Sequence, residues 1–369
     1  MADIRILLTG GHAATTGIAV IEEIRKTEKL KDSKIYWLGA QTAMEGSKIS
    51  TLESRVFPRI GVQFIPIIAG KIQTKFTRHT IPSILKIPVG FIQAFWYLVK
   101  IRPNVVLSFG GYSSFPVVFW SWVFRIPVIL HEQTVAAGRA SISSSPFATK
   151  IALARSESLS YFPKNKSVIT GNPLMSNVLK VKPRKYLGNP PTILIIGGSR
   201  GSNFINDLII DIAKNLLPRF VLIHITGERD FEKVEKFKET LEPNLKENYK
   251  TYLSIDPPEI GSYYSRADII ISRSGANSVS EIIYVKRPAI LIPLPKTFMN
   301  EQFKNAKYAE SFGFCKVFTE KEATQEAVLK EINRIIENWQ MTLKLSNNVS
   351  PDTNASKKVV ELLEESLHD

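Results

Sequence analysis

The chain has 369 residues, a length that predicts two domains, each large enough for its own core. A hydrophobic content of 44% with 22% charged residues is typical of a globular protein and argues against a low-complexity chain. The single cysteine, Cys315, excludes an internal disulfide, fits a reducing compartment and is expected to be a small buried side chain.

The net charge of +14 is concentrated in the first half of the chain. The first 170 residues hold 21 Lys and Arg against 9 Asp and Glu, whereas the rest holds 27 against 25. No acidic residue occurs between Glu53 and Glu132, although that stretch carries many Lys and Arg residues. Such a one-sided basic region indicates an anionic partner, which is nucleic acid, anionic lipid or a phosphate-bearing substrate.

The same stretch is rich in aromatic side chains. Rings mixed with cations are typical of a membrane-interface patch, because the rings enter the headgroup region while the cations meet lipid phosphates. The alternative is that the rings belong to the core. Nucleic acid is less favoured, since no recognised binding motif accompanies the charge. The rings are those of Phe91, Phe95, Trp96, Tyr97, Phe119, Trp120, Trp122 and Phe124.

The first half alternates apolar runs with amphipathic stretches. We expect the apolar run Ile4–Leu8 to be a first strand rather than part of a signal peptide, because no long apolar core or cleavage site follows it. The uncharged stretch 103–124 contains glycines, serines and a proline, so it predicts a strand, a loop and a helix rather than one membrane-spanning helix. The predicted strands are Ile4–Leu8, Ile35–Leu38, Gln63–Pro66, Val105–Ser108, Val128–Leu130 and Lys150–Ala154, and the helices include Gly17–Thr27 and Val89–Lys100.

A second series of strands and helices starts after Gly171-Asn172-Pro173. The charged, Pro- and Gly-containing segment Lys180–Pro191 should be exposed near the boundary. The predicted strands are Thr192–Ile196, Phe220–Thr226, Thr251–Leu253, Ile269–Ser272, Ala289–Ile292 and Cys315–Val317. The predicted helices are Phe204–Leu216, Ser278–Val285, Glu301–Phe312, Gln325–Asn338 and, at the C-terminal end, Ser356–Leu367.

This alternation predicts two doubly wound α/β domains with parallel sheets, facing each other across a cleft. The first domain covers residues 1–170 and the second covers residues 171–345. In such sheets ligands bind at the carboxyl ends of strands, close to helix N-termini.

Three glycine loops follow predicted strands: Thr9–His12, Phe109–Ser113 and Gly197–Gly201. Glycines let the backbone approach a phosphate, and the helix after the first loop is expected to offer unpaired N–H groups to an anion. In the third loop, Ser199 can donate a hydrogen bond to a phosphate and Arg200 adds charge. The loops lack both a dinucleotide-binding glycine pattern and the Lys-Ser/Thr ending of an ATP-binding loop.

The segment Ser272–Glu281 passes from a strand to a helix start that is rich in small hydroxylated residues, a favourable place for a diphosphate. Glu281 falls in the first turns of that helix. Its carboxylate can accept two hydrogen bonds from a ribose diol, or it can simply complement the helix dipole.

Taken together, these segments resemble the MurG family, which transfers GlcNAc from UDP-GlcNAc to undecaprenyl-pyrophosphoryl-MurNAc-pentapeptide. The matches occur in family order and span Ile6 to about Phe318. They are Thr9–His12, Phe109–Tyr112, Ile126–Gln133, Gly171–Pro173, Gly197–Gly201, Ala267–Glu281, Gln302 and Asn305–Ala306.

The resemblance implies a GT-B fold in which an acceptor-binding, membrane-facing first domain works with a UDP-GlcNAc-binding second domain. The last helix, residues 356–367, would pack back on the first domain. The expected partners are UDP-GlcNAc, a polyprenyl-pyrophosphoryl sugar acceptor and an anionic membrane surface, without nucleic acid. The expected location is peripheral, on the cytoplasmic face of the cell membrane, with a role in peptidoglycan synthesis.

The resemblance also implies site residues. Glu281 would bind the ribose, Ile255 would lie near the uracil, and Gln302 would contact the sugar hydroxyls. Gly110, Gly111 and Tyr112 would bind the acceptor diphosphate. The full set of expected UDP-GlcNAc contacts is Thr9, Gly10, Gly11, Thr134, Met175, Ser199, Ile255, Ala276, Asn277, Ser278, Val279, Ser280, Glu281 and Gln302.

The implied reaction is an inverting displacement, in which the 4-hydroxyl of the acceptor attacks the anomeric carbon while UDP leaves. This step needs a base, and positive charge or N–H dipoles for the diphosphate. His12 is the first candidate, either as the base or as a donor to the pyrophosphate of the acceptor. Glu132 is the second candidate, and a structural role is the alternative for each. The sequence has no metal-ligand cluster and no Asp-x-Asp motif, so we expect neither a cofactor nor a metal ion.

The chain departs from the family pattern mainly in its acceptor half. Ile6-Leu7-Leu8 replaces glycines before the first loop, Thr134 replaces an Asn, and the Arg expected near Met175 is absent. This asymmetry fits a divergent acceptor. The alternatives are a GT-B transferase that acts on another membrane lipid, a catalytically silent membrane scaffold, and a nucleotide-sugar epimerase, which would not need a basic aromatic face.

Overall fold

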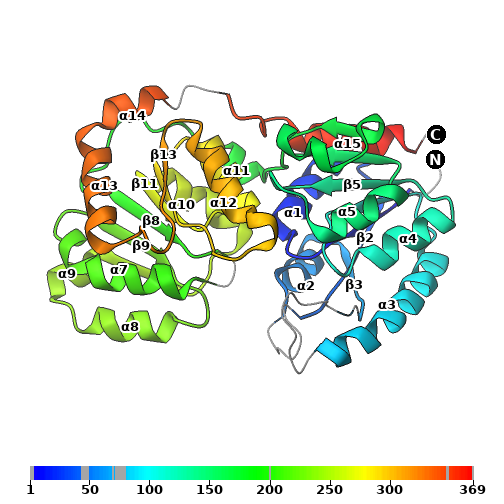
Figure 1. Cartoon of the computed structure of the whole chain (residues 1–369), viewed down its shortest axis with the longest axis horizontal. Coiled ribbons are helices and arrows are strands. Elements are labelled where there is room, and N and C mark those ends of the chain that lie inside the picture. The colour runs from blue at the N-terminus through cyan, green and yellow to red at the C-terminus, as the bar shows by residue number, and fades with distance from the viewer. Residues whose placement is uncertain are drawn as a thin grey trace. The chain divides into compact units, whose positions relative to one another are not determined.

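The structure, a computed structural model, describes residues 4–42, 50–68, 70, 80–198, 201–345 and 349–367 (Figure 1). Residue contacts divide the chain into two compact units. The first unit runs to Met175 and includes the C-terminal segment from Asn354, and the second unit is Ser176–Thr353. The first unit therefore extends slightly beyond the boundary that the sequence places at residue 170.

The first unit contains a parallel sheet of seven strands in the order β3-β2-β1-β4-β5-β6-β7. The order reverses between β1 and β4, which pair in register from Ile6↔Val105 to Thr9↔Ser108. The loops that follow these two strands therefore leave the sheet side by side, at the switch point where ligands bind in such folds. The strands are β1 (Arg5–Thr9), β2 (Lys34–Gly39), β3 (Gln63–Pro66), β4 (Val105–Ser108), β5 (Val128–Glu132), β6 (Lys150–Leu153) and β7 (Ser167–Ile169).

Helices cover this sheet, and its core forms where the buried residues Leu7, Val106 and Val128 of the strands pack against Leu98 and Val117 of two helices. The α-helices are α1 (Ala14–Ile24), α2 (Leu52–Val56), α3 (Thr80–Ile101), α4 (Phe115–Val123), α5 (Arg139–Ser144) and α15 (Ala355–Glu365). The short 3-10 helices are η1 (Phe57–Ile60), η2 (Ser145–Phe147), η3 (Ser156–Tyr161) and η4 (Lys164–Lys166). The C-terminal helix α15 packs against α1, and α3 packs against α4 (Figure 1).

The second unit contains a parallel six-stranded sheet in the order β10-β9-β8-β11-β12-β13. Its order reverses between β8 and β11, where Ile196 pairs with Ser272. The third glycine loop and the segment Ser272–Glu281 therefore begin at neighbouring strand ends. The strands are β8 (Thr192–Ile196), β9 (Val221–Ile225), β10 (Tyr249–Tyr252), β11 (Ile269–Ser272), β12 (Ala289–Leu291) and β13 (Cys315–Val317).

The longer helices of the second unit, such as α7 and α13, each bury one apolar side. In α7, for example, Ile205, Leu208, Ile209 and Ile212 recur at helical spacing and join the core. The α-helices are α6 (Ser176–Leu179), α7 (Asn203–Leu216), α8 (Phe231–Glu239), α9 (Pro243–Asn248), α10 (Ile260–Arg266), α11 (Ala276–Val285), α12 (Glu301–Glu310), α13 (Gln325–Glu337) and α14 (Trp339–Leu345). The 3-10 helices are η5 (Pro257–Glu259) and η6 (Phe298–Asn300).

The parallel, doubly wound architecture predicted from the sequence is confirmed. The stretch 103–124 forms β4, a loop and α4, and none of the described helices is long and apolar enough to span a membrane. The start of α1 differs from the prediction, because Gly17 lies inside the helix instead of beginning it. A Cβ atom on Gly17 would lie 2.9 Å from the Trp37 ring, so glycine here permits close helix–sheet packing.

The predicted boundary segment is anchored at one point. The buried Asp268 accepts hydrogen bonds from Arg184 Nε at 2.8 Å, Gly188 N at 3.1 Å and Thr192 N at 2.8 Å. Because these donors lie in or next to Lys180–Pro191, the largely exposed segment is fixed to the beginning of β8 and β11.

Candidate functional site

The two glycine loops of the first unit contact each other at the ends of β1 and β4. Gly11 N donates to Gly110 O at 3.1 Å, and Ser113 Oγ donates to Gly10 O at 3.3 Å. Gly111 has a φ of +91°, and a Cβ atom there would lie 2.7 Å from Gly11 N. The glycines therefore bring two backbone segments together, a role that no larger residue could fill at position 111.

His12 follows this contact and has a φ of 61°, in the left-handed region. Its side chain is exposed and lines a small pocket with Gly10, Gly11 and Tyr112. The pocket is completed by Ala40, Thr42, Thr51 and Glu53. Thr9 is fully buried, and its hydroxyl donates to Leu38 O at 2.8 Å, so that side chain supports the loop from within the sheet.

Glu132, the second candidate base, is 4% exposed and already engaged. Its Oε1 accepts from Thr134 N at 3.1 Å, and its Oε2 accepts from Gly138 N at 3.0 Å. The Thr134 hydroxyl lies 3.0 Å from the same Oε1 and also contacts Ala136 O. These contacts describe the structural alternative, in which Glu132 holds the turn after β5. Met175 is buried.

In the second unit, Glu281 lies on α11 and is buried against α10. Tyr264 Oη donates to Glu281 Oε2 at 2.7 Å. Burial raises the pKa of Glu281 to about 7, and the hydrogen bond from Tyr264 acts in the opposite direction. Burial, with the nearby carboxylate, raises the pKa of Tyr264 well above its ordinary value, so the phenol stays a donor. Sequence reasoning missed Tyr264.

The start of α11 presents the other predicted donor contacts. Ala276, Asn277 and Ser278 are half-buried in its first turn, whereas Val279 and Ser280 are buried. At Gly275, no described side chain caps the helix, which keeps the positive end of its dipole available to an anion. Ser199 and the neighbouring Arg200, predicted to approach the phosphates, lie outside the described residues.

Arg273 organises the strand ends beneath this helix. Its Nε donates to Ser202 Oγ at 2.9 Å, its Nη1 to Ile292 O at 3.1 Å, and its Nη2 pairs with Glu320 at 2.6 Å. The guanidinium thereby connects the ends of β11 and β12 with the start of α7 and the segment after β13. Its position inside the predicted motif was clear from the sequence, but its supporting role was not.

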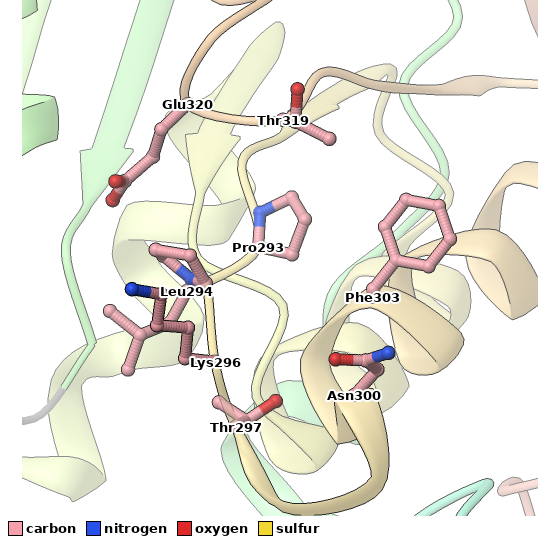
Figure 2. Close-up of a pocket in the computed structure, with 9 residues that line it drawn as sticks. Pro293, Leu294, Lys296, Thr297, Asn300, Phe303, Thr319 and Glu320 are labelled. Atoms are coloured by element: carbon pink, nitrogen blue, oxygen red, sulfur yellow. The ribbon is translucent and has the colours of Figure 1, made fainter.

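A cavity of about 290 Å³ lies beside the loop that Gln302 holds, although Gln302 is not one of its lining residues (Figure 2). Gln302 Oε1 accepts from Leu294 N at 2.9 Å, and Gln302 O accepts from Ser274 Oγ at 2.8 Å, so it fixes the loop between β12 and α12. Figure 2 shows Pro293 between Glu320 and Phe303. The lining residues are Pro293, Leu294, Pro295, Lys296, Thr297, Asn300, Phe303, Thr319 and Glu320. Ile255 lies half-buried between β10 and η5.

Within the described ranges, no group of three or more His, Cys, Asp or Glu side chains is placed to hold a metal ion. The candidate site therefore consists of two parts, one at the switch point of each sheet. The first contains His12 in a glycine-lined pocket, and the second contains Glu281 near an uncapped helix N-terminus.

The two sheets and their loops have the GT-B fold of nucleotide-sugar enzymes, which solved structures share over nearly the full length. MurG of Acinetobacter baumannii aligns with a TM-score of 0.69 at 24% identity, covering 98% of this chain and 99% of that one. UDP-GlcNAc 2-epimerase from Neisseria meningitidis, bound to UDP-GlcNAc, aligns with a TM-score of 0.70 at 16% identity over 98% and 99%. At these identities the likeness shows the fold alone.

Sequence comparison is more specific. Residues 9–153 match the glycosyltransferase family 28 N-terminal domain, and residues 192–363 match the glycosyltransferase family 28 C-terminal domain. The chain belongs to glycosyltransferase family 28.

Two clostridial relatives bear the name UDP-N-acetylglucosamine–N-acetylmuramyl-(pentapeptide) pyrophosphoryl-undecaprenol N-acetylglucosamine transferase. The protein from Clostridium botulinum is 31% identical over 373 residues, covering 97% of this chain and 98% of the relative. The protein from Clostridium tetani is 32% identical over 367 residues, covering 98% and 97%. The predicted relationship to the MurG family is thereby confirmed.

Proposed function

We propose that this glycosyltransferase moves GlcNAc from UDP-GlcNAc to the MurNAc 4-hydroxyl of undecaprenyl-pyrophosphoryl-MurNAc-pentapeptide. The observation that carries the proposal is the match of 31% identity over 97% of the chain to a relative named for that transfer. A retained family fold alone would not favour this reaction, because epimerases share it.

The donor half of the proposal rests on the second unit. We assign the UDP diphosphate to the N-terminal turn of α11 and the ribose diol to the Glu281 carboxylate. The cavity beside the Gln302 loop is the proposed place for part of the sugar. The proposed mode of leaving-group stabilisation uses helix dipoles and side chains without a divalent cation, so a chelator should leave turnover unchanged.

The acceptor half rests on the first unit. We assign the general base to His12, because imidazole titrates near neutral pH and this side chain is exposed in the glycine pocket. Glu132 is the weaker candidate, since its carboxylate already accepts hydrogen bonds from two backbone N–H groups. The Gly110–Tyr112 loop is the proposed contact for the acceptor diphosphate.

The proposed membrane contact rests on a surface that we call the α3–α4 patch. It combines exposed apolar residues with neighbouring cations, and Lys100 Nζ lies 5.1 Å from the Trp96 ring centre. Arg102 and Arg125 are also exposed. The apolar residues of the patch, each 37–70% exposed, are Leu85, Val89, Ile92, Phe95, Trp96, Val99, Trp122, Val123 and Phe124.

The spacing of these residues supports an apolar environment outside the fold. On α3, the exposed Leu85, Val89, Ile92, Trp96 and Val99 recur every three or four residues, so they form one stripe. The opposite side of α3 already packs into the core. A helix that is apolar on both sides needs a second apolar partner, and because the sequence has no acidic residue between Glu53 and Glu132 we propose the anionic inner leaflet. The protein would therefore be peripheral to the cytoplasmic face.

A donor-and-acceptor screen tests the proposed function. Purified protein with UDP-GlcNAc and the lipid-linked MurNAc-pentapeptide should release UDP and form the disaccharide product. UDP release with a diacylglycerol acceptor instead would favour a transferase acting on another membrane lipid. Donor binding without turnover on any acceptor would contradict both enzymatic assignments and favour a scaffold.

A further inference from the structure

Glu53 is a buried carboxylate next to the candidate base, and the family resemblance assigned it no role. It lies in the first turn of α2 and is only 3% exposed. Its Oε1 accepts a hydrogen bond from the backbone N–H of Ala13 at 2.9 Å. Among the described residues this carboxylate forms no ion pair, and burying a carboxylate is costly, so its position at the edge of the His12 pocket calls for a reason.

The hydrogen bond from Ala13 acts on the backbone of His12. The N–H of Ala13 belongs to the peptide that directly follows His12, whose φ of 61° is unusual for a residue with a side chain. Residues with a side chain persist in that region only when their surroundings fix them. The Glu53 carboxylate fixes this peptide and so the direction in which the imidazole leaves the chain.

The same contact occupies the N-terminus of α1. The N-cap residue Ala13 has no side chain that could cap the helix itself, and the first turn of α1 contains no acidic residue. Burial raises the pKa of the Glu53 carboxyl group, and the backbone N–H groups of Glu53, Ala13 and His12 partly offset that rise. The N–H group of the N-cap residue at this helix start is thus already bonded to a side chain of the protein.

The carboxylate is itself held in place. Thr51 caps α2 by accepting from Ser54 N at 3.2 Å, and its hydroxyl donates to Ala40 O at 2.9 Å at the end of β2. Thr51, Ala40 and Glu53 line the same pocket as His12. A chain of contacts therefore runs from β2 through the start of α2 to the peptide that carries the imidazole.

We propose that Glu53 is a positioning residue for His12. Its carboxylate holds the His12–Ala13 peptide so that the imidazole is presented to the acceptor hydroxyl. This inference rests on the proposed function for its catalytic consequence but not for its structural part. Glu53 touches no reacting atom in this assignment and takes no proton in the reaction.

The structural part is tested by hydrogen exchange on the full chain. Glu53→Ala removes the acceptor, whereas Glu53→Gln keeps an oxygen for the Ala13 N–H. We expect Glu53→Ala to speed exchange of the Ala13 amide by about tenfold and Glu53→Gln to restore most of the protection. Glu331→Ala is the matched control, because Glu331 is also buried, at 7% exposed, but lies on α13. Unchanged Ala13 exchange in Glu53→Ala would overturn the proposal.

The catalytic part is tested by a double-mutant cycle. Glu53→Ala should lower kcat by about 10- to 100-fold with little change in the KM for UDP-GlcNAc, because a misplaced base slows chemistry without weakening donor binding. In a His12→Asn background the same change should cost less than about twofold, since the base is already gone. If the fold-decreases in kcat of the two single variants multiply in the double variant, Glu53 acts independently of His12, and the proposal is overturned.

The two arms separate this inference from the proposed function. If the wild-type protein shows no turnover with the lipid-linked acceptor, the proposed function fails, while exchange at Ala13 still decides whether Glu53 holds the peptide. If turnover is normal and exchange is unchanged by Glu53→Ala, the proposed function stands and the positioning role fails.

Discussion

His12 is the residue on which the chemistry of the first unit depends. Its imidazole is exposed in a pocket lined by Gly10, Gly11 and Tyr112, while its backbone lies in the left-handed region. A useful variant must remove the base without disturbing that backbone. Asn tolerates the left-handed region better than most residues with a side chain, so His12→Asn separates the two effects.

We expect His12→Asn to lower kcat by about 100-fold or more, within the range that general base catalysis contributes, while thermal stability stays within about 2 °C of wild type. Steady-state kinetics and a thermal melt measure the two quantities. A variant that retains wild-type kcat would show that His12 is not the base and would return attention to Glu132.

Glu281 gives the second prediction at this scale. Only the ionised carboxylate can accept both hydroxyls of a ribose diol, and burial raises the pKa of Glu281 to about 7. UDP affinity should therefore weaken as the pH falls below about 7, approaching tenfold per pH unit. Calorimetric titrations between pH 5.5 and 8.5 measure it, with Glu281→Gln as the control that isolates the titration of UDP itself.

Tyr264→Phe sharpens this test. Removing the hydrogen bond to Glu281 Oε2 takes away a stabiliser of the ionised form, so the midpoint of the pH dependence should move to higher pH. In the unliganded protein, the contribution of Glu281 to the free energy of unfolding should fall as the pH rises, whereas UDP affinity should increase. Because the folded pKa of Glu281 lies above its ordinary value, its contribution is fully present below about pH 4.5 and is lost as the pH rises through about 7.

At the scale of elements, α3 and α4 divide their aromatic side chains between two tasks. Trp120 packs against Phe95 with ring centres 5.0 Å apart and is partly buried against the core, so it joins the two helices. Trp96 and Trp122 are 56% and 52% exposed. The core interpretation therefore applies to Trp120, and the surface interpretation applies to Trp96 and Trp122.

Replacing surface residues of α3 tests the membrane proposal. Ile92→Ser with Trp96→Ser should reduce binding to vesicles of anionic lipid by about tenfold or more, because two large apolar side chains no longer enter the bilayer. The change should leave the melting temperature nearly unaltered. Val349→Ser, at a residue 81% exposed in the second unit, is the matched control.

Vesicle binding should also weaken with added salt and with neutral lipid, because the patch cations meet lipid phosphates across a screened interface. Sedimentation with vesicles of defined composition measures this. Binding that ignores both lipid charge and the α3 substitutions would exclude the α3–α4 patch as the membrane contact.

At the scale of the whole molecule, the chain leaves the first unit at Met175 and returns to it at Asn354. The returning helix α15 buries Val359, Val360 and Leu363 and packs against α1. Because α1 follows the His12 loop, the C-terminal helix supports the first unit at the helix that directly follows the candidate base.

Deleting residues 354–369 should therefore destabilise the first unit while sparing the second. We expect faster hydrogen exchange in α1 and β1, with UDP binding to the second unit retained within about threefold. Loss of UDP binding together with unchanged exchange in α1 would contradict the claim that α15 stabilises the first unit and not the second.

The sequence predicted the architecture well because buried parallel strands are apolar runs bounded by turn residues. Gln63–Pro66, Thr192–Ile196 and Cys315–Val317 form strands with the predicted bounds. The edge strand β7 (Ser167–Ile169) was missed because its residues are half-buried or exposed and follow a charged turn. Helix α3 begins before its predicted start at Val89, because Pro88, which directly precedes that position, lies inside the helix.

Only the site residues that lie within local sequence motifs could be predicted. Glycines after strands and a carboxylate at a helix start are visible in the sequence, and the resemblance to the MurG family then singled out His12 and Glu281. Their partners are not, because Glu53 meets Ala13 across 40 residues and Tyr264 meets Glu281 from another helix. A buried carboxylate or phenol carries no local signature of the group it will contact.

The most direct measurement of the central claim is product formation by purified protein from UDP-GlcNAc and undecaprenyl-pyrophosphoryl-MurNAc-pentapeptide, followed by UDP release and mass spectrometry of the lipid. We expect one GlcNAc to be added per UDP released, and strongly reduced turnover in His12→Asn. UDP binding by the wild-type protein without any GlcNAc-bearing lipid product would contradict it.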